Sequence, residues 1–343
     1  MPPATTTVAL TGATGFVGRH VLPALLNKGY HVRVLARHPG KLRQSGEHVS
    51  VVEGGLFDDD AIRQLCTGVD AVVHLVGIIT EKPGKGQTFD RVHHEASVRL
   101  LDAAQAAGVK RWVHMSALGA RPDAVSRYHQ TKWLAEEAVR GSSLQWTIFR
   151  PSIIHGPDGE FMELVRGFWC NLFPPFVPFF GANAGLRDIW EIKKAVLAPW
   201  RSLKRAGNAG EPRYVSRATA GRLQPVWVDD VAHCFAEAVE SPRAVGEVYP
   251  LGGPVAYTWP DLYRAVRRHL PADEVRSKKI VALPVWYARL IAGKPGVPFD
   301  RGQVIMSQEQ SVCDVGKAER DFAFTAADFE TKLAEYAPRI GVA

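Results

Sequence analysis

The fold of this chain is decided by the stretch Val8-Ala-Leu-Thr11-Gly12-Ala-Thr14-Gly15-Phe16-Val17-Gly18-Arg-His20. A short apolar run ends at a glycine-rich turn, and a segment with helical apolar periodicity follows. In this GxxGxxG spacing, the first two glycines let the backbone turn and approach a pyrophosphate, and the third lets the helix pack close to the strand. The free N–H groups of the helix would point at the phosphates. The stretch predicts a dinucleotide site rather than a purely structural glycine turn.

The composition is that of an ordinary globular protein. The chain has 343 residues, of which 46% are hydrophobic and 22% charged,. Its four cysteines are scattered with no CxxC pair, which argues against a disulfide scaffold or a zinc site and favours a reducing compartment,. The scattered cysteines lead us to expect no metal site. No signal peptide and no membrane-spanning apolar run is visible, so we expect a cytoplasmic protein, with peripheral attachment to the inner membrane as the alternative.

The first half alternates short strands with helical segments. Strands rich in β-branched and apolar residues are expected at 8–11, 31–36, 49–53, 71–76, 111–116 and 146–150,. Helices are expected at 17–28, 61–65, 89–107 and 127–140,. This alternation predicts an α/β, Rossmann-type doubly wound parallel sheet with a smaller C-terminal substrate domain. The expected division is a nucleotide-binding domain at 1–155 and a substrate part at 156–343, with a strand near 224–228 returning to the sheet.

The second half is less regular. The Phe/Pro cluster Phe168–Gly181 is expected to be a wall or lid over a pocket. Thr258, followed by Trp-Pro-Asp261, has the chemistry of a helix start, and a last helix is expected at 326–336,.

The second strand carries the signal for cofactor choice. An NAD site usually has an acidic residue about 20 residues past the glycines, where it holds the ribose 2′-OH. This chain reads Ala36-Arg37-His38 there, with no acid. Arg37 is a fork-shaped cation suited to a 2′-phosphate, so we expect NADP(H) to be preferred over NAD(H). The alternative is a solvated loop charge.

Three residues form a candidate catalytic group. Ser116 ends the fifth strand, and Tyr128 and Lys132 follow at a YxxxK spacing that places both on one helix face,. A nearby ammonium lowers the pKa of a phenol, so this tyrosine is expected to exchange a proton with a substrate carbonyl or hydroxyl. Lys132 can also hold the nicotinamide ribose, and Ser116 can fix the substrate oxygen.

At these residues the chain resembles the short-chain dehydrogenase/reductase superfamily, in its extended and atypical branches of NAD-dependent epimerases and dehydratases. Further markers are Arg150-Pro-Ser-Ile-Ile-His-Gly-Pro157, Gln224-Pro-Val-Trp-Val-Asp-Asp230 and Leu251-Gly-Gly-Pro254. Within that superfamily the chain is most similar to bacterial relatives of the NADPH-binding accessory subunit of respiratory complex I. The stretches His74-Leu-Val-Gly-Ile-Ile79, Tyr128-His-Gln-Thr-Lys132 and Phe322–Phe329 carry that likeness.

The resemblance implies roles residue by residue. The residues implied to contact the cofactor are Gly12, Thr14, Gly15, Phe16, Val17, Gly18, Arg37, Leu56, Leu75, Val76, Gly77, Lys132, Pro151 and Ile153.

Three departures from the family pattern put catalysis in doubt more than binding. His93 replaces a proton-relaying Asn, Gly54-Gly55 replaces a Gly-Asp pair and leaves the Leu56 backbone for the adenine, and Leu75-Val76-Gly77 replaces an Asn-rich turn. His93 either relays protons or merely packs.

Most of the net charge of +7 lies in one segment. Residues 185–222 hold nine Lys/Arg against three Asp/Glu. Within it, Leu186–Trp200 is expected to be a helix with an apolar stripe of Ile189, Ile192, Val196 and Leu197,. Residues 186–205 could contact a membrane surface or a respiratory complex, or could be an ordinary helix with a solvated basic face. No nucleic-acid motif accompanies the charge.

Two main functions follow. The first is an NADP-dependent oxidoreductase or epimerase acting on an unidentified small carbonyl or hydroxyl compound, with the apolar side chains of the second half favouring an apolar substrate. The second is a non-catalytic NADPH-binding accessory subunit associated with complex I at the membrane. A redox-sensing binder is a third.

Overall fold

The computed structural model describes residues 6–204, 212, 214–294, 297 and 299–341. The chain forms two units, each assembled from three separate segments. Unit 1 contains Met1–Ser152, Val228–Gly252 and Cys313–Ala326, and unit 2 contains Ile153–Trp227, Gly253–Val312 and Ala327–Ala343. Unit 2 begins at Ile153, near the expected boundary at 155, but two later segments return to unit 1 where a single strand was expected to return.

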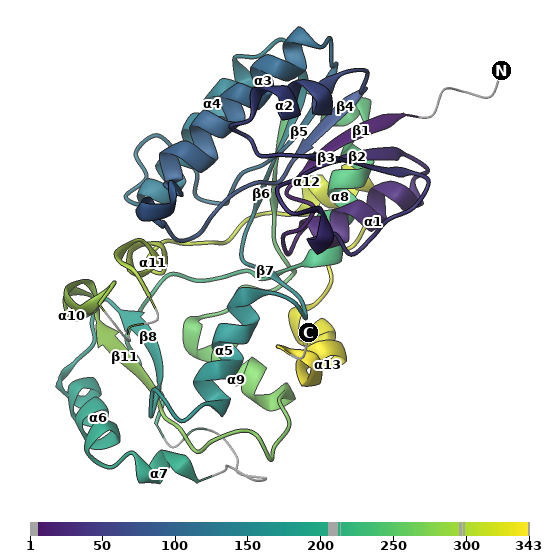
Figure 1. The fold of residues 1–343 in the computed structure, drawn as a ribbon. Coiled ribbons are helices and arrows are strands. Elements are labelled where there is room, and N and C mark those ends of the chain that lie inside the picture. The colour runs from purple at the N-terminus through teal and green to yellow at the C-terminus, as the bar shows by residue number, and fades with distance from the viewer. Residues whose placement is uncertain (1–5, 205–211, 213, 295–296, 298, 342–343) are drawn as a thin grey trace. The chain divides into compact units, whose positions relative to one another are not determined.

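Unit 1 is built on a parallel seven-stranded sheet with the strand order β10-β6-β5-β4-β1-β2-β3 (Figure 1). The strands are β1 (Thr7–Thr11), β2 (His31–Ala36), β3 (Val49–Glu53), β4 (Ala71–His74), β5 (Arg111–Met115), β6 (Gln145–Pro151) and β10 (Glu247–Leu251). The order reverses at β1, which lies between β2 and β4. Ligands of such sheets bind beyond the carboxyl ends of the strands at this reversal. The predicted doubly wound fold is confirmed.

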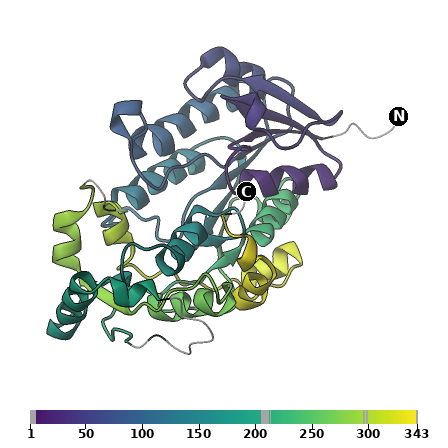
Figure 2. The same ribbon diagram turned by 60° about the horizontal axis from the view of Figure 1, so that its bottom comes forward.

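Helices cover both faces of this sheet (Figure 1; Figure 2). The helices are α1 (Gly18–Asn27), α2 (Asp59–Cys66), α3 (Ala96–Ala106), α4 (Arg127–Arg140), α8 (Val228–Ala238) and α12 (Gly316–Phe322). α1 packs on α8 and α8 on α12, whereas α2, α3 and α4 form the other layer. A six-residue π-helical segment, Asp90–Glu95, precedes α3 where one continuous helix was expected. Such π-helical turns are rare and are frequent at functional sites.

The strand expected near 224–228 does not return to the main sheet. β9 (Val226–Trp227) pairs with β7 (Ile154–His155) inside unit 2, and the added edge strand of unit 1 is β10. The alternation of Glu247-Val-Tyr-Pro-Leu251 is interrupted by a proline, which is tolerated at a sheet edge and hides the strand in the sequence,.

Unit 2 packs helices on the parallel strand pair β8 (Val177–Gly181) and β11 (Ile280–Pro284). The other helices of this unit are α5 (Glu160–Cys170), α6 (Leu186–Leu197), α7 (Trp200–Leu203), α9 (Trp259–His269), α10 (Val285–Ile291), α11 (Arg301–Met306) and α13 (Phe329–Tyr336). Thr258 caps α9, as expected, by accepting a hydrogen bond from the Asp261 N–H at 3.2 Å. Among the described residues, no helix has the length and apolar character needed to cross a bilayer.

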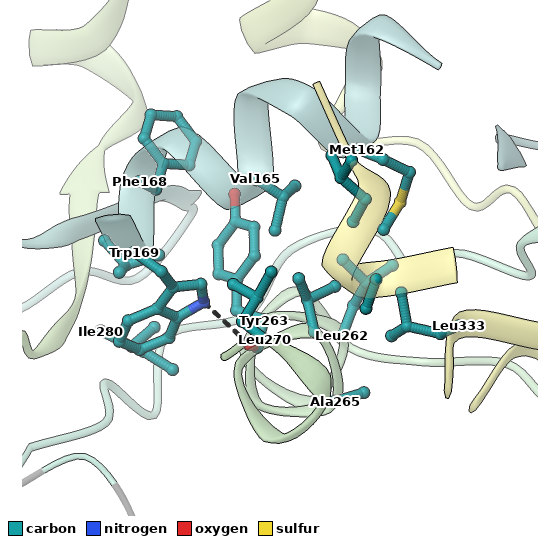
Figure 3. Close-up of a cluster of buried hydrophobic side chains, with 14 of the residues drawn as sticks. Met162, Val165, Phe168, Trp169, Leu262, Tyr263, Ala265, Leu270, Ile280 and Leu333 are labelled. Atoms are coloured by element: carbon teal, nitrogen blue, oxygen red, sulfur yellow. Dashed lines mark hydrogen bonds between the residues drawn. The ribbon is translucent and has the colours of Figure 1, made fainter. Parts of the chain in front are cut away.

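The Phe/Pro cluster is largely a core rather than a lid. Phe168 and Trp169 end α5, Phe179 lies in β8, and all three are buried. They pack with Tyr263 and neighbouring apolar side chains (Figure 3), and Trp169 donates its indole N–H to the Tyr263 carbonyl at 3.0 Å. Only Leu172 and Phe173, between these two elements, are exposed large apolar side chains. The expected wall over a pocket is therefore corrected to the interior of unit 2.

Candidate active site

The glycine-rich loop joins β1 to α1. Gly12 has a φ of +82°, a conformation that side-chain-bearing residues rarely adopt,. A Cβ on Gly18 would lie 2.1 Å from the Gly12 carbonyl oxygen, so only glycine allows the helix to approach this closely. No side chain caps α1 at Val17, and the N–H groups of Arg19, His20 and Val21 donate to the Gly15 and Val17 carbonyls. This cradle fits the pyrophosphate of a dinucleotide.

The other loops implied to contact a cofactor follow the carboxyl ends of strands in the same sheet. Leu75, Val76 and Gly77 follow β4, and Leu56 follows β3. A Cβ on Gly12 would lie 3.2 Å from the Leu75 Cβ, so the loops after β1 and β4 meet. Pro151 ends β6 in the same sheet, whereas Ile153 belongs to unit 2.

Arg37 directly follows β2 and is exposed. It has no hydrogen bond or ion pair with any residue that the structure describes. A Cβ on Gly55 would lie 3.5 Å from the Arg37 Cγ, so the stem of the arginine runs past the loop that follows β3. The guanidinium is therefore available at the edge of the sheet where the ribose of a dinucleotide is expected.

Lys132 is buried on α4 and reaches the same edge of the sheet. Its ammonium donates a hydrogen bond to the Met115 carbonyl at the end of β5, at 3.0 Å. A Cβ on Gly77 would lie 3.0 Å from the Lys132 Nζ. Burial lowers the pKa of Lys132 to about 8, although the Glu136 carboxylate acts in the opposite direction. The lysine lies where the resemblance implies contact with the nicotinamide ribose.

Tyr128 lies one helical turn before Lys132, with its ring among aromatic side chains. The ring centroids of Phe89 and His93 are 5.7 and 5.3 Å away, both edge-on. Burial raises the pKa of Tyr128 to about 12. The expectation of a phenol acidified by Lys132 is therefore wrong, because desolvation disfavours the phenolate and the ammonium is directed at Met115,. The phenol is neutral near pH 7 and able to donate a proton.

The Ser116 hydroxyl has a protein partner that the sequence analysis missed. It donates to Oε1 of Glu136 at 2.5 Å. Glu136 is fully buried and also accepts hydrogen bonds from Arg140 and Arg150, each with a closest contact of 2.6 Å. The available sequence signal is spacing, since Tyr128, Lys132 and Glu136 follow one another every four residues on α4,.

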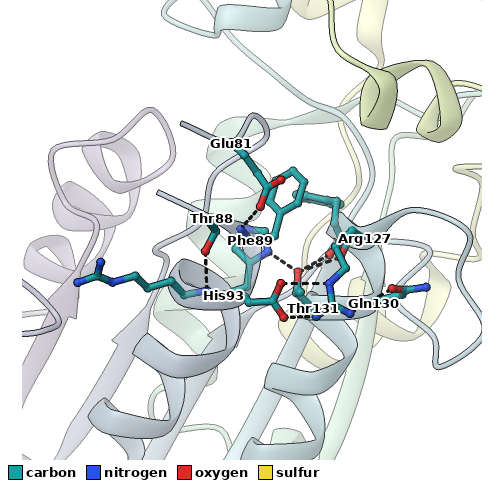
Figure 4. Close-up of polar contacts among 10 residues, drawn as sticks. Glu81, Thr88, Phe89, His93, Arg127, Gln130 and Thr131 are labelled. Atoms are coloured by element: carbon teal, nitrogen blue, oxygen red, sulfur yellow. Dashed lines mark hydrogen bonds and ion pairs between the residues drawn. The ribbon is translucent and has the colours of Figure 1, made fainter. Parts of the chain in front are cut away.

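His93 is a packed, neutral histidine (Figure 4). Its Nδ1 lies 2.9 Å from the Thr131 hydroxyl, and its Nε2 lies 3.1 Å from the Ile78 backbone nitrogen. Its ring stacks on Phe89. Burial, followed by the nearby Lys132 charge, lowers the pKa of His93 to about 2. Of its two sequence interpretations, the structure favours packing over proton relay.

Comparisons with known proteins agree with this geometry. Residues 12–165 match the family model described as NAD(P)H-binding. A ceramide reductase of Caulobacter vibrioides is 37% identical over 161 residues, which are 46% of this chain and 50% of the relative. Subunit 9 of the mitochondrial NADH dehydrogenase (ubiquinone) 1 alpha subcomplex of Arabidopsis thaliana is 27% identical over 290 residues, 82% of this chain and 61% of the relative. The chain thus spans about half to three fifths of the length of these relatives.

The fold has solved counterparts. A short-chain dehydrogenase/reductase superfamily protein from Agrobacterium tumefaciens, with bound NAD, superposes with a TM-score of 0.63. It is 23% identical, and the alignment covers 96% of this chain and 95% of that structure. Residues 12–165 therefore match an NAD(P)H-binding family model, and the chain has the fold of this short-chain dehydrogenase/reductase superfamily protein.

Proposed function

We propose that this chain is an NADP(H)-dependent oxidoreductase that reduces the carbonyl group of an apolar or amphipathic small molecule. The observation that carries the proposal is the position of Lys132, whose buried ammonium lies beside Gly77 at the carboxyl end of β4, one turn after Tyr128. The reductase relative matched over the nucleotide-binding domain supports the same reaction type.

The nicotinamide cofactor, when bound, supplies the hydride that goes to the carbonyl carbon. The proton for the carbonyl oxygen comes from the Tyr128 hydroxyl, which the raised pKa keeps protonated near neutrality,. Lys132 would hold the ribose of the bound nucleotide, and burial lowers the pKa of its ammonium to about 8.

The first experiment is mass spectrometry of protein purified without added nucleotide, followed by mixing with a panel of aliphatic and aromatic carbonyl compounds. We expect bound NADPH that one of these compounds oxidises. Tyr128→Phe should keep the nucleotide and lose turnover by about a hundredfold or more, the usual contribution of a positioned acid. Tyr257→Phe removes a hydroxyl from unit 2 and is the matched control. Full turnover by Tyr128→Phe would refute the assignment, and turnover with no net nucleotide oxidation would indicate an epimerase.

A second candidate is a non-catalytic NADPH-binding subunit of a respiratory complex. The hydrogen bond of Ser116 to the buried Glu136 favours it, because the hydroxyl expected to orient the substrate is already engaged. The similarity to an NADH dehydrogenase subunit supports it as well. Two results together would favour this candidate over the reductase: none of the carbonyl compounds oxidises the bound NADPH, and respiratory subunits co-purify with the chain.

A further inference from the structure

The basic helix α6 in unit 2 turns only the Ile192 part of the predicted stripe toward the core. Its two carboxylates face inward and are buried. The Asp188 carboxylate accepts a hydrogen bond from the Tyr214 hydroxyl at 3.0 Å, and Glu191 pairs with Lys279 of the segment leading into β11. Val196 and Leu197, expected in the core, are exposed instead. The only acids of residues 186–204 are therefore removed from the outer surface of this helix.

Helix α10 covers the same face of the β8–β11 pair as α6. Val281 and Leu283 point to this face from β11, and Ala288 of α10 packs on them. Ile192 and Ala195 of α6 pack against the same cluster. Both helices lie beside β8 and β11 in Figure 1, and each leaves its side chains away from this cluster exposed.

These outer surfaces carry large apolar side chains, three of them tryptophans. We call the set the tryptophan face: Leu186, Trp190, Val196, Leu197, Trp200, Trp286, Tyr287 and Leu290. Leu186 is 86% exposed, Leu197 75% and Trp286 67%. Leaving this much apolar surface in water is unfavourable, and single soluble domains rarely do so without a binding role.

The two segments of the tryptophan face, 186–204 and 285–294, carry exposed cations and, among their described residues, no exposed acid. The exposed cations of its two segments are Arg187, Lys193, Lys194, Arg201, Lys204, Arg289 and Lys294. Residues 285–294 contain no acid at all. The ammonium of Lys194 lies 5.1 Å from the centre of the Trp190 ring, so a cation and an apolar ring share one patch. Arg205, the last residue of the basic segment predicted from the sequence, lies outside the described residues.

We propose that the tryptophan face docks unit 2 on an anionic phospholipid bilayer. Tryptophan and leucine enter the boundary between headgroups and acyl chains, and the bordering cations meet the anionic headgroups. A second copy of the chain is a poorer occupant. A two-fold interface would place the same cations of both copies against one another, where like charges repel.

The test is flotation of the full chain with vesicles of equal parts phosphatidylglycerol and phosphatidylcholine, against vesicles of phosphatidylcholine alone. We expect binding to the anionic vesicles that weakens as salt rises, since screening shortens the reach of the cations. Failure to float with anionic vesicles at low salt would overturn the proposal. Vesicle binding is measured without turnover, so this failure would leave the reductase assignment untouched.

Two double variants separate the apolar from the charged contribution. Lys193→Glu with Lys194→Glu should weaken binding to anionic vesicles by about thirtyfold or more, at the usual contribution of one cation near such a surface. Trp190→Ser with Leu197→Ser should also lose binding, because the apolar insertion is gone. The control is Lys85→Glu with Lys110→Glu, which makes the same charge change on exposed residues of unit 1 and should bind like the wild type.

Thermal unfolding and NADPH affinity of each variant verify that it folds. Equal weakening by the control pair would reduce the effect to net charge and overturn the proposal. The same holds if the serine variant binds vesicles like the wild type. If sedimentation shows a dimer that the serine variant abolishes, while no form binds vesicles, the face is an interface between copies instead.

Discussion

Arg37 is the single residue that we expect to decide cofactor choice. It follows β2 where an NAD site would carry an acid, and it has no hydrogen-bond or ion-pair partner among the described residues,. We expect Arg37→Glu to weaken NADPH binding by at least about tenfold, the loss of one charge-assisted hydrogen bond, and to leave NADH affinity nearly unchanged. Titration of both nucleotides by fluorescence measures this.

Lys110→Glu is the matched control for this measurement, because it makes the same charge change at an exposed lysine that precedes β5. Equal loss of NADPH and NADH affinity in Arg37→Glu would show that the arginine does not read the 2′-phosphate. A loss of the same size in the control would attribute the effect to overall charge.

The residues of the site could be predicted to different extents. The loop glycines, Tyr128 and Lys132 were readable because their spacing alone fixes which helix face or turn they occupy. The engagement of Ser116 was not, since it depends on Glu136 being fully buried between Arg140 and Arg150. Burial of an ion-pair network is a tertiary property, and no local spacing shows that it excludes water.

The β1–loop–α1 element depends on Gly18 for packing. A Cβ there would lie 2.1 Å from the Gly12 carbonyl oxygen and 2.6 Å from the Ala13 Cα, both backbone atoms that cannot move aside alone. We expect Gly18→Ala to lower the free energy of unfolding by about 2 kcal/mol or more and to weaken nucleotide binding, because α1 must shift away from the loop.

Gly40→Ala is the control, since a Cβ on Gly40 meets nothing within 4 Å. Urea unfolding and nucleotide titration compare the two. If Gly18→Ala were as stable as Gly40→Ala and bound nucleotide equally well, close helix–strand packing would not be the role of the third glycine.

Most elements of unit 1 were predictable from the sequence, whereas the buried face of helix α6 in unit 2 was predictable only in part. Strands β1, β2, β4, β5 and β6 carry buried apolar residues that the sequence displays directly, whereas in β3 only Val52 is buried. In helix α6, Ile192 packs inward as predicted, but apolar periodicity takes carboxylates to be outward, whereas Asp188 and Glu191 turn inward to Tyr214 and Lys279. Partners distant in sequence thus overrode the local pattern.

Across the whole molecule, four fully buried histidines are neutral in the folded state. Burial lowers the pKa of His74 and of His155 to about 3 and that of His93 to about 2, and holds the pKa of His114 well below its ordinary value. The first three have hydrogen-bond partners. Neither ring nitrogen of His114 has one among the described residues. Three of the four lie in unit 1, and His155 lies in unit 2.

Acid should therefore destabilise unit 1 before unit 2. An unfolded histidine takes up a proton as the pH falls through about 6.5, whereas the buried form does not, so the unfolded state binds more protons and stability falls with pH. Between about pH 7 and pH 5, each such histidine removes about 2 kcal/mol. Three of them remove about 6 kcal/mol from unit 1, which is comparable to the total stability of a domain.

Hydrogen exchange with mass spectrometry resolves the two units. On acidification toward pH 5, peptides from β4 and β5 should lose protection before peptides from α5 and α9. His114→Leu removes one of the titrating groups at similar volume, so it should keep unit 1 protected to lower pH, while His38→Gln, at an exposed histidine, should not. Earlier loss of protection in unit 2, or no shift with His114→Leu, would mean that groups other than these histidines govern acid unfolding.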